Sequence, residues 1–148
     1  MELKNTQWNI FARPNKMPDV YGGSSTCIDS MIKPFVKEHS ISGQWPKGIL
    51  LTGKPGGGKT TIAKIIAMSM ACKHLDADGN PCGECQDCKS IINEVWNRDV
   101  KLVNAAELKN NGESSVDGMK RLVESSRTLP FFGKRKVIII DEIQEILK

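Results

Sequence analysis

The sequence predicts an α/β fold in which helices flank a parallel β-sheet. Short apolar runs alternate with segments of helical periodicity, an order that favours parallel strands joined by helices. The run at residues 137–140 is apolar at every position, as a strand covered on both faces requires. A glycine-rich loop at residues 53–58 separates another apolar run from a long helical pattern. Together these observations predict one domain over residues 1–148.

The composition is that of an ordinary globular domain. Hydrophobic residues make up 39% and charged residues 26%, and the net charge of +4 permits contact with nucleic acid without requiring it. No apolar run approaches the roughly 20 residues that span a bilayer, and the start of the chain is polar. We therefore expect a cytoplasmic protein with no membrane partner, whose cysteines stay reduced and are candidate metal ligands.

The first part of the chain is expected to form an arm followed by a helix. Residues 1–23 are polar with scattered prolines, which indicates an ordered arm. The helix has possible N-caps at Ser24, Ser25 and Thr26, and Pro34 is expected to kink or shorten it. Its predicted apolar face consists of Ile28, Met31, Ile32, Phe35 and Val36.

The remaining elements are expected to alternate between strands and helices. Strands are predicted at residues 49–52, 100–103 and 137–140, the first of them buried. A helix is predicted over residues 59–71, with a shorter one around residues 90–96. The long helix has Ala63, Ile66, Ala67 and Met70 on one face. Another helix begins at the capping-box pattern of Ser114 and Asp117, with Met119, Leu122, Val123 and Ser126 on one face.

The glycine-rich loop matches G-x-x-x-x-G-K-[ST], the pattern of a phosphate-binding loop, at every fixed position. Its glycines let backbone N–H groups surround phosphate oxygens, and the N-terminus of the next helix attracts the same anion. Lys59 can reach the β- and γ-phosphates, and the Thr60 hydroxyl can ligate Mg²⁺. The predicted nucleotide-binding residues here are Gly53, Lys54, Pro55, Gly56, Gly57, Gly58, Lys59, Thr60 and Thr61. The alternative is a glycine-rich turn that matches by chance, and the predicted strand and helix on either side argue against it.

An acidic pair follows the last apolar run. Asp141 in this position can hold Mg²⁺ through water, and Glu142 can orient or deprotonate an attacking water. We therefore predict Lys59, Asp141 and Glu142 as catalytic residues. The alternative is an acidic pair that only caps the strand, and the phosphate-loop pattern upstream makes it less favoured.

Four cysteines have the spacing C-x9-C-x2-C-x2-C, namely Cys72, Cys82, Cys85 and Cys88. Four thiolates match a tetrahedral structural Zn²⁺ site with no position open to water. We predict a zinc-binding insertion at about residues 72–88. A redox C-x-x-C pair or a set of free thiols is the alternative, but a redox pair uses only two of the four. Cys27 lies apart in the sequence and is expected to be a plain thiol.

The order of these motifs resembles the gamma/tau clamp-loader subunits, which are AAA+ ATPases. The resemblance rests on the phosphate loop, a helix that ends in cysteine, the Pro-Cys-Gly-x-Cys-x-x-Cys segment and the Asp-Glu pair after an apolar strand. The segment from Arg13 to Gly23 is also similar to the family's R-P-x-x-F-x-D-V-x-G-Q arm. The zinc module after the first helix distinguishes this family from other AAA+ proteins.

The resemblance implies a fold, cofactors and partners. The fold would be a P-loop NTPase (AAA+) sheet with a small inserted zinc module, and the cofactors would be ATP, Mg²⁺ and Zn²⁺. Val20 and Tyr21 would contact the base, because the arm lies against adenine and ribose in the family. The partners would be other clamp-loader subunits in a hetero-oligomeric ring, a sliding clamp and, through the assembled complex, primer–template DNA.

The sequence departs from the family pattern at several positions. Met17 replaces the usual Phe, Gly23 replaces the usual Gln, Asn104 stands where an acidic residue is common, and Gln144 stands where His is frequent. The family also continues with a sensor residue, a Ser-Arg-Cys motif, a helical lid and a collar. Because none of these precedes Lys148, we expect the chain to be a truncated, partial AAA+ domain.

Three other functions remain open at this stage. The chain could be another replication AAA+ ATPase such as a helicase loader, although the cysteines argue against it. It could be a nucleotide-binding or zinc-stabilised interaction module that does not hydrolyse ATP. Direct DNA binding through the cysteine segment or Lys134, Arg135 and Lys136 is less favoured, because three basic residues at a turn are more often simply solvated.

Overall fold

The computed structural model describes residues 13–20, 27–96, 99–109, 114–131 and 134–147. The chain forms two compact units, Met1–Val95 and Trp96–Lys148. Among the described helices, none has both the length and the apolar character to cross a bilayer.

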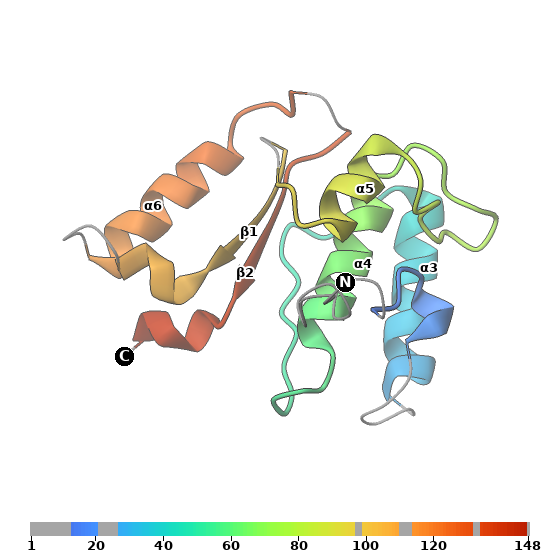
Figure 1. Ribbon diagram of the computed structural model, residues 1–148, viewed down its shortest axis with the longest axis horizontal. Helices are drawn as coiled ribbons and strands as arrows, with labels where there is room; N and C mark the ends of the chain where they lie inside the picture. Colours follow the sequence, from blue (N-terminus) through green and yellow to red (C-terminus); the bar gives the residue numbers. More distant parts are fainter. Residues whose placement is uncertain (1–12, 21–26, 97–98, 110–113, 132–133, 148) are drawn as a thin grey trace, which may run out of the picture. The chain divides into compact units, whose positions relative to one another are not determined.

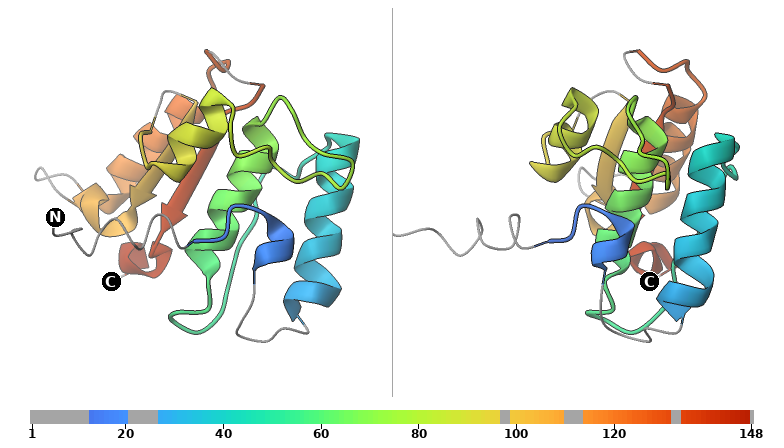
Figure 2. Two further views of the ribbon diagram at one scale, coloured as in Figure 1. Left: turned by 45° about the vertical axis from the view of Figure 1, so that its right-hand side comes forward. Right: turned by 90° about the vertical axis from the view of Figure 1, so that its right-hand side faces the viewer.

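The first unit is helical and is organised around the helix that follows the glycine loop. Its elements are η1 (Met17–Asp19), η2 (Ile28–Ile32), α3 (Lys33–Ser42), α4 (Lys59–Ala71) and α5 (Gln86–Ile92). Figures 1 and 2 show α4 between α3 and α5. This arrangement buries α4 on most sides. The predicted single apolar stripe was therefore too narrow, since Ile65 and Met68 are more buried than Ala63 and Met70.

The helix that contains Pro34 begins with a π-helical turn. The π-helix η2 continues directly into α3, and Pro34 lies in the first turn of α3. Because helical residues precede Pro34, the π-helical turn is the local irregularity that accommodates a residue with no N–H to donate. Ile28 and Val36 of the predicted apolar face are buried, but Met31 is 66% exposed, contrary to prediction. The predicted N-caps at Ser24, Ser25 and Thr26 lie outside the described residues.

Two predictions about local structure in this unit were wrong. Residues 49–52 form no strand, and Leu50 is 73% exposed. An apolar run becomes a strand only when a neighbouring strand pairs with its backbone, and no described segment does so. The short helix predicted around residues 90–96 begins earlier, because Cys85 caps α5 and the helix ends at Ile92.

The second unit contains a two-stranded parallel sheet. Its elements are β1 (Val100–Asn104), η3 (Ala105–Lys109), α6 (Ser115–Ser126), β2 (Val137–Asp141) and η4 (Ile143–Leu147). The strands pair in register from Val100 with Val137 to Asn104 with Asp141. Figure 1 shows β1 and β2 side by side with α6 on one side of the pair. Both predicted strands are confirmed, but β2 is half-exposed rather than covered on both faces.

The start of α6 is fixed by the predicted capping box. The backbone N–H of Asp117 donates to Ser114 Oγ at 3.2 Å, and that hydroxyl donates to Asp117 Oδ2 at 2.6 Å. The bond from Ser114 holds the pKa of the Asp117 carboxyl below its usual value. The reciprocal contact satisfies an N–H that the first helical turn leaves without a partner. Of the predicted apolar face, Met119 and Leu122 are half-buried, whereas Val123 is 47% exposed.

The loop between α4 and α5 packs closely on α3. Gly79 has a φ of +79°, and a Cβ placed on it would lie 2.6 Å from Ser40 Cβ and 3.3 Å from the Lys37 carbonyl oxygen. Nearby, Lys37 Nζ donates to Asp78 Oδ1 at 2.6 Å. The glycine is therefore required both by the backbone conformation and by the close approach of α3.

Replacing this glycine should destabilise the first unit. We expect Gly79→Ala to lower the free energy of unfolding by about 2 kcal/mol or more, from left-handed strain and overpacking. Gly48→Ala is the matched control, because a Cβ there meets nothing within 4 Å and its φ is not in the left-handed region. Thermal unfolding of the two variants provides the measurement, and equal midpoints would contradict the packing described here.

Candidate functional site

The glycine-rich loop lies immediately before α4. Gly56 and Gly58 have φ values of +76° and +77°, a region that residues with a Cβ rarely adopt. A Cβ on Gly57 would lie 3.1 Å from the Lys54 carbonyl oxygen, to which the Gly57 N–H also donates at 3.2 Å. The left-handed φ values at Gly56 and Gly58 and the close contact at Gly57 therefore favour glycine at all three positions. The loop residues Gly53 to Gly57 are exposed or nearly so, and Gly58 caps α4.

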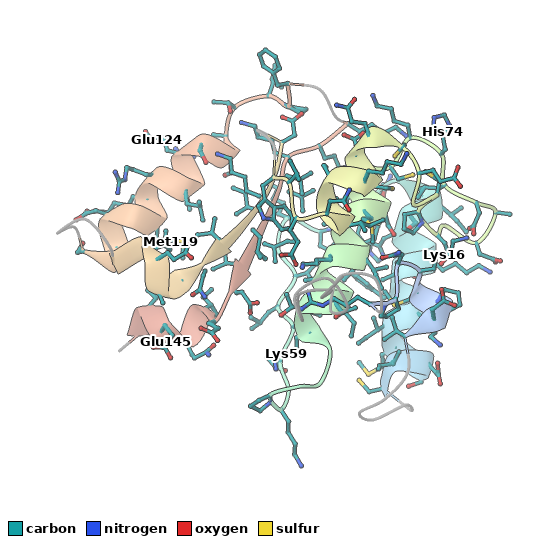
Figure 3. All side chains as sticks on the ribbon, in the orientation of Figure 1. Lys16, Lys59, His74, Met119, Glu124 and Glu145 are labelled. Atoms are coloured by element: carbon teal, nitrogen blue, oxygen red, sulfur yellow. The ribbon has the colours of Figure 1, made fainter. Side chains whose placement is uncertain are left out.

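Lys59 is the first residue of α4 and reaches back over the loop. Its Nζ donates to the carbonyl oxygens of Gly53 at 3.0 Å and Lys54 at 2.8 Å. Figure 3 shows Lys59 at the junction of loop and helix. The first N–H groups of α4 point the same way, because the first turn of a helix has no intrahelical acceptor for them. An ammonium group and a helix N-terminus at one loop form a site suited to an anion such as phosphate.

The acidic pair lies in the second unit, where β2 ends. Asp141 is the last residue of β2 and is half-buried, while Glu142 is exposed. The Glu142 N–H donates to Asp141 Oδ1 at 2.9 Å, and Glu142 has a φ of +54°. A left-handed conformation costs a residue with a side chain about 1 kcal/mol. Strain of this kind is concentrated at functional sites, which makes Glu142 a candidate on structural grounds as well.

Of the two predicted base-contacting residues, the structure describes Val20. Val20 follows η1, is 5% exposed, and donates its backbone N–H to the Met17 carbonyl at 3.2 Å. Tyr21 lies outside the described residues. A cavity of about 20 Å³ is lined by residues of the arm, of α4 and of the end of α5, among them Arg13, Pro14, Asn15, Thr61, Lys64 and Glu94. This volume corresponds to about one water molecule, so the cavity is not itself a nucleobase pocket.

The four predicted metal-ligating cysteines come together in the first unit. Their Sγ atoms all lie within 4.8 Å of one another. Cys72 Sγ is 3.6 Å from Cys82 Sγ and 4.0 Å from Cys85 Sγ. A tetrahedral zinc ion with Zn–S bonds of 2.3 Å requires sulfur–sulfur distances of about 3.8 Å. The four side chains therefore fit a zinc ion, and Cys27 does not belong to the cluster.

Backbone N–H groups surround the sulfurs of this cluster. The N–H groups of Cys85 and Glu84 donate to Cys82 Sγ at 3.3 and 3.4 Å, and they lower the pKa of the Cys82 thiol to about 6. Burial acts in the opposite direction on Cys72 and Cys88, and it raises the pKa of both thiols. A dication bound among the sulfurs would supply the positive charge that lets the buried pair ionise.

Sequence reasoning missed a charged cluster beside the loop helix. Lys64 of α4 is 8% exposed, and its Nζ forms an ion pair with Glu94 Oε1. The same oxygen accepts from Arg13 Nη1 at 3.4 Å. One usable signal was present in the sequence, a lysine in the otherwise apolar stretch at residues 62–68, because a buried ammonium needs an acidic partner.

Comparison with known proteins identifies relatives of this chain. A family profile described as "DNA polymerase III, delta subunit" matches residues 29–148. The chain is 35% identical over 130 residues to the DNA polymerase III subunit gamma/tau of Mycoplasma pneumoniae. It is 33% identical over 131 residues to subunit tau of Bacillus subtilis and 32% identical over 131 residues to subunit gamma of Buchnera aphidicola. Each alignment covers 88% of this chain but only 17%, 21% and 32% of those relatives, respectively.

The cysteine cluster leads to a direct test. Cys88→Ser should lose most of the bound zinc and unfold at a lower temperature, because a structural zinc site stabilises only the folded chain. Cys27→Ser is the control, since Cys27 is exposed and outside the cluster. Elemental analysis after gel filtration gives the zinc content. A purified wild-type protein without stoichiometric zinc, or a Cys88→Ser variant that retains it, would contradict a four-cysteine site.

Proposed function

This chain belongs to the DNA polymerase III gamma/tau clamp-loader family, as its N-terminal part, and from that premise we propose that it is an ATP-binding and ATP-hydrolysing subunit that helps to load a sliding clamp on primed DNA. The observation that carries the proposal is the glycine loop at the start of α4, with Lys59 Nζ held among its carbonyl oxygens. Because the chain spans a third or less of the relatives described above, the activity of the whole protein is part of the proposal.

The loop is proposed to bind the phosphates of ATP. Its glycines allow the backbone N–H groups to turn inward, and Lys59 exchanges its two carbonyl partners for phosphate oxygens at little cost, because it is already directed over the loop. Thr61, on the first turn of α4, also lines the small cavity beside the arm. Val20 and Tyr21 are proposed to contact the base, and the preference for ATP over GTP would come from that arm, because the loop reads only phosphates.

Thr60 and Asp141 are proposed to hold Mg²⁺, a cation that prefers hydroxyl, carboxylate and water oxygens. When bound, the ion would neutralise charge on the phosphates during transfer. Glu142 is proposed to orient the attacking water and to accept its proton, for which an exposed carboxylate is suited. Its backbone adopts the left-handed conformation directly after the end of β2.

Zinc is proposed to have a structural role. Four sulfurs satisfy a tetrahedral ion and leave no position for water or substrate, so the site would not take part in the chemistry. Its position between α4 and α5 suits a clip that fixes the connection between the two helices.

Other subunits of a hetero-oligomeric ring, the sliding clamp and primer–template DNA are the proposed partners, and a neighbouring subunit would supply an arginine for hydrolysis. The basic turn at Lys134, Arg135 and Lys136 is not proposed as a DNA site. Lys136 instead donates to the Ser125 carbonyl at 2.9 Å and therefore contributes to the second unit.

Clamp loading itself tests this function. The full-length protein, assembled with its partner subunits, should place a sliding clamp on primed DNA only when ATP is present. ATP binding without hydrolysis by that complex would favour a non-hydrolysing interaction module. ATPase activity with transfer of a helicase in place of a clamp would favour a helicase loader.

Lys59 is the most informative residue for nucleotide binding. Lys59→Ala should weaken ATP binding by about 30-fold or more, because a charge-assisted contact to phosphate is removed. Lys120→Ala is the control, since Lys120 is exposed and lies on α6 in the second unit. A fluorescent ATP analogue titrated against both variants gives the dissociation constants. Equal affinities would remove the loop from the proposed site.

Glu142 separates binding from hydrolysis. Glu142→Gln should bind ATP as well as the wild type does but hydrolyse it at least about 100-fold more slowly, because the amide cannot accept a proton from water. Single-turnover hydrolysis in the assembled complex provides the rate. A variant with normal turnover would show that the acidic pair only ends the strand.

A further inference from the structure

Glu94 stands at a backbone position where glycine is the usual residue. It follows α5, and the N–H groups of Glu94 and Val95 donate to the carbonyls of Ile91 at 3.2 Å and Ser90 at 2.8 Å. These two bonds form a Schellman motif, and Glu94 occupies its left-handed position with a φ of +57°. A residue with a Cβ is strained there, which makes the side chain of Glu94 a candidate for a role that glycine could not fill.

The carboxylate of Glu94 joins two segments that are distant in sequence. Oε1 pairs with Lys64 on the loop helix α4 and accepts from Arg13 Nη1, in the segment before η1, at 3.4 Å. The Lys64 side chain is only 10% exposed, whereas those of Glu94 and Arg13 are 39% and 43% exposed. The buried ammonium of the lysine therefore holds the carboxylate in place, and the carboxylate also accepts a hydrogen bond from the arginine.

The position of Glu94 is set by the helix that the cysteines hold. Cys85 caps α5, Cys88 lies within it, and both belong to the four-sulfur cluster. Cys88 and Ile91 have no exposed surface, so α5 is tightly packed where it contacts α4. Five residues separate Cys88 from Glu94, and all of them lie in α5 or at its C-cap. A metal ion bound by the cluster would therefore hold α5 in place and, through this short helical segment, the carboxylate of Glu94.

We propose that Glu94 is a positioning residue that fastens the N-terminal arm, residues 13–20, to the phosphate-loop helix through Arg13 and Lys64. The inference rests on the proposed function, in which this arm contacts the nucleotide. The zinc-held helix α5 then determines where the arm lies, and the loss of zinc loosens the arm as well as the cysteine loop. The small cavity lined by Arg13, Asn15, Thr61 and Glu94 marks the place where arm and helix meet.

Two substitutions at Glu94 separate the role of the side chain from that of the backbone. Glu94→Gly relieves the left-handed strain and removes the carboxylate, whereas Glu94→Gln keeps the strain and removes only the charge. Combining Glu94→Gly with Lys64→Met removes the buried ammonium together with its partner, so that an unpaired charge does not unfold the chain. Glu38→Gln is the control, an exposed glutamate on α3 for which no ion pair occurs in the described structure.

The first measurement is hydrogen exchange of the amides of residues 13–20 in the full-length protein. We expect faster exchange in all three Glu94 variants and not in Glu38→Gln, with a thermal midpoint for Glu94→Gly equal to or above that of Glu94→Gln. Removing zinc from the wild type with a chelator should produce the same increase, and should add little in Glu94→Gln. Unchanged exchange of the arm in the Glu94 variants overturns the proposal, whether or not the protein binds ATP.

The second measurement is the dissociation constant for a fluorescent ATP analogue. The Glu94 variants should bind about three- to tenfold more weakly than the wild type, as expected for one partly exposed charge-assisted contact acting through the arm. Arg13→Gln should give a similar loss, and the double variant Arg13→Gln with Glu94→Gln should add little to either. If Lys59→Ala weakens binding but the Glu94 variants bind normally, the inference fails while the proposed function stands. If the wild type binds no ATP, the proposed function fails instead.

Discussion

The burial of α4 between α3 and α5 is the constraint on which the first unit depends. Ile65 and Ala67 of this helix have no exposed surface, and beyond its first turn only Ala63 and Met70 are partly exposed. Close packing of this kind leaves the helix little freedom to rotate or slide. The N-terminus of α4, the glycine loop before it and Lys59 are consequently held in place, as a binding site for an anion requires.

The cysteine segment also connects α4 to the two helices that pack on it, α3 and α5. Toward α3, the loop is anchored by the close approach of Gly79 and by the ion pair of Lys37 with Asp78. Toward α5, Cys85 and Cys88 tie the cluster to a helix that packs on α4. A structural metal at such a junction compensates for a small hydrophobic core, because the ligand bonds replace contacts that a short insertion cannot make.

The elements that the sequence predicted well are those whose signal is local. The helix over residues 59–71 and the capping box at Ser114 were predicted with their observed starts, since caps and periodicity depend on neighbouring residues. The run at residues 49–52 was predicted as a buried strand and is not one. Its apolar residues indicate burial, but a strand forms only when the backbone pairs with another segment, which lies elsewhere in the chain.

The sequence by itself determined which residues are candidates for chemistry, namely the glycine loop, the four cysteines and the acidic pair, because each is a short pattern whose residue types follow from the ligand it is predicted to bind. Only the tertiary structure decided that Lys64 is a buried charge, that Glu94 lies in a strained cap, and that Arg13 reaches the same carboxylate. These residues are separated by up to 81 positions. No local pattern connects them, because their contact arises from the packing of α5 and the arm on α4.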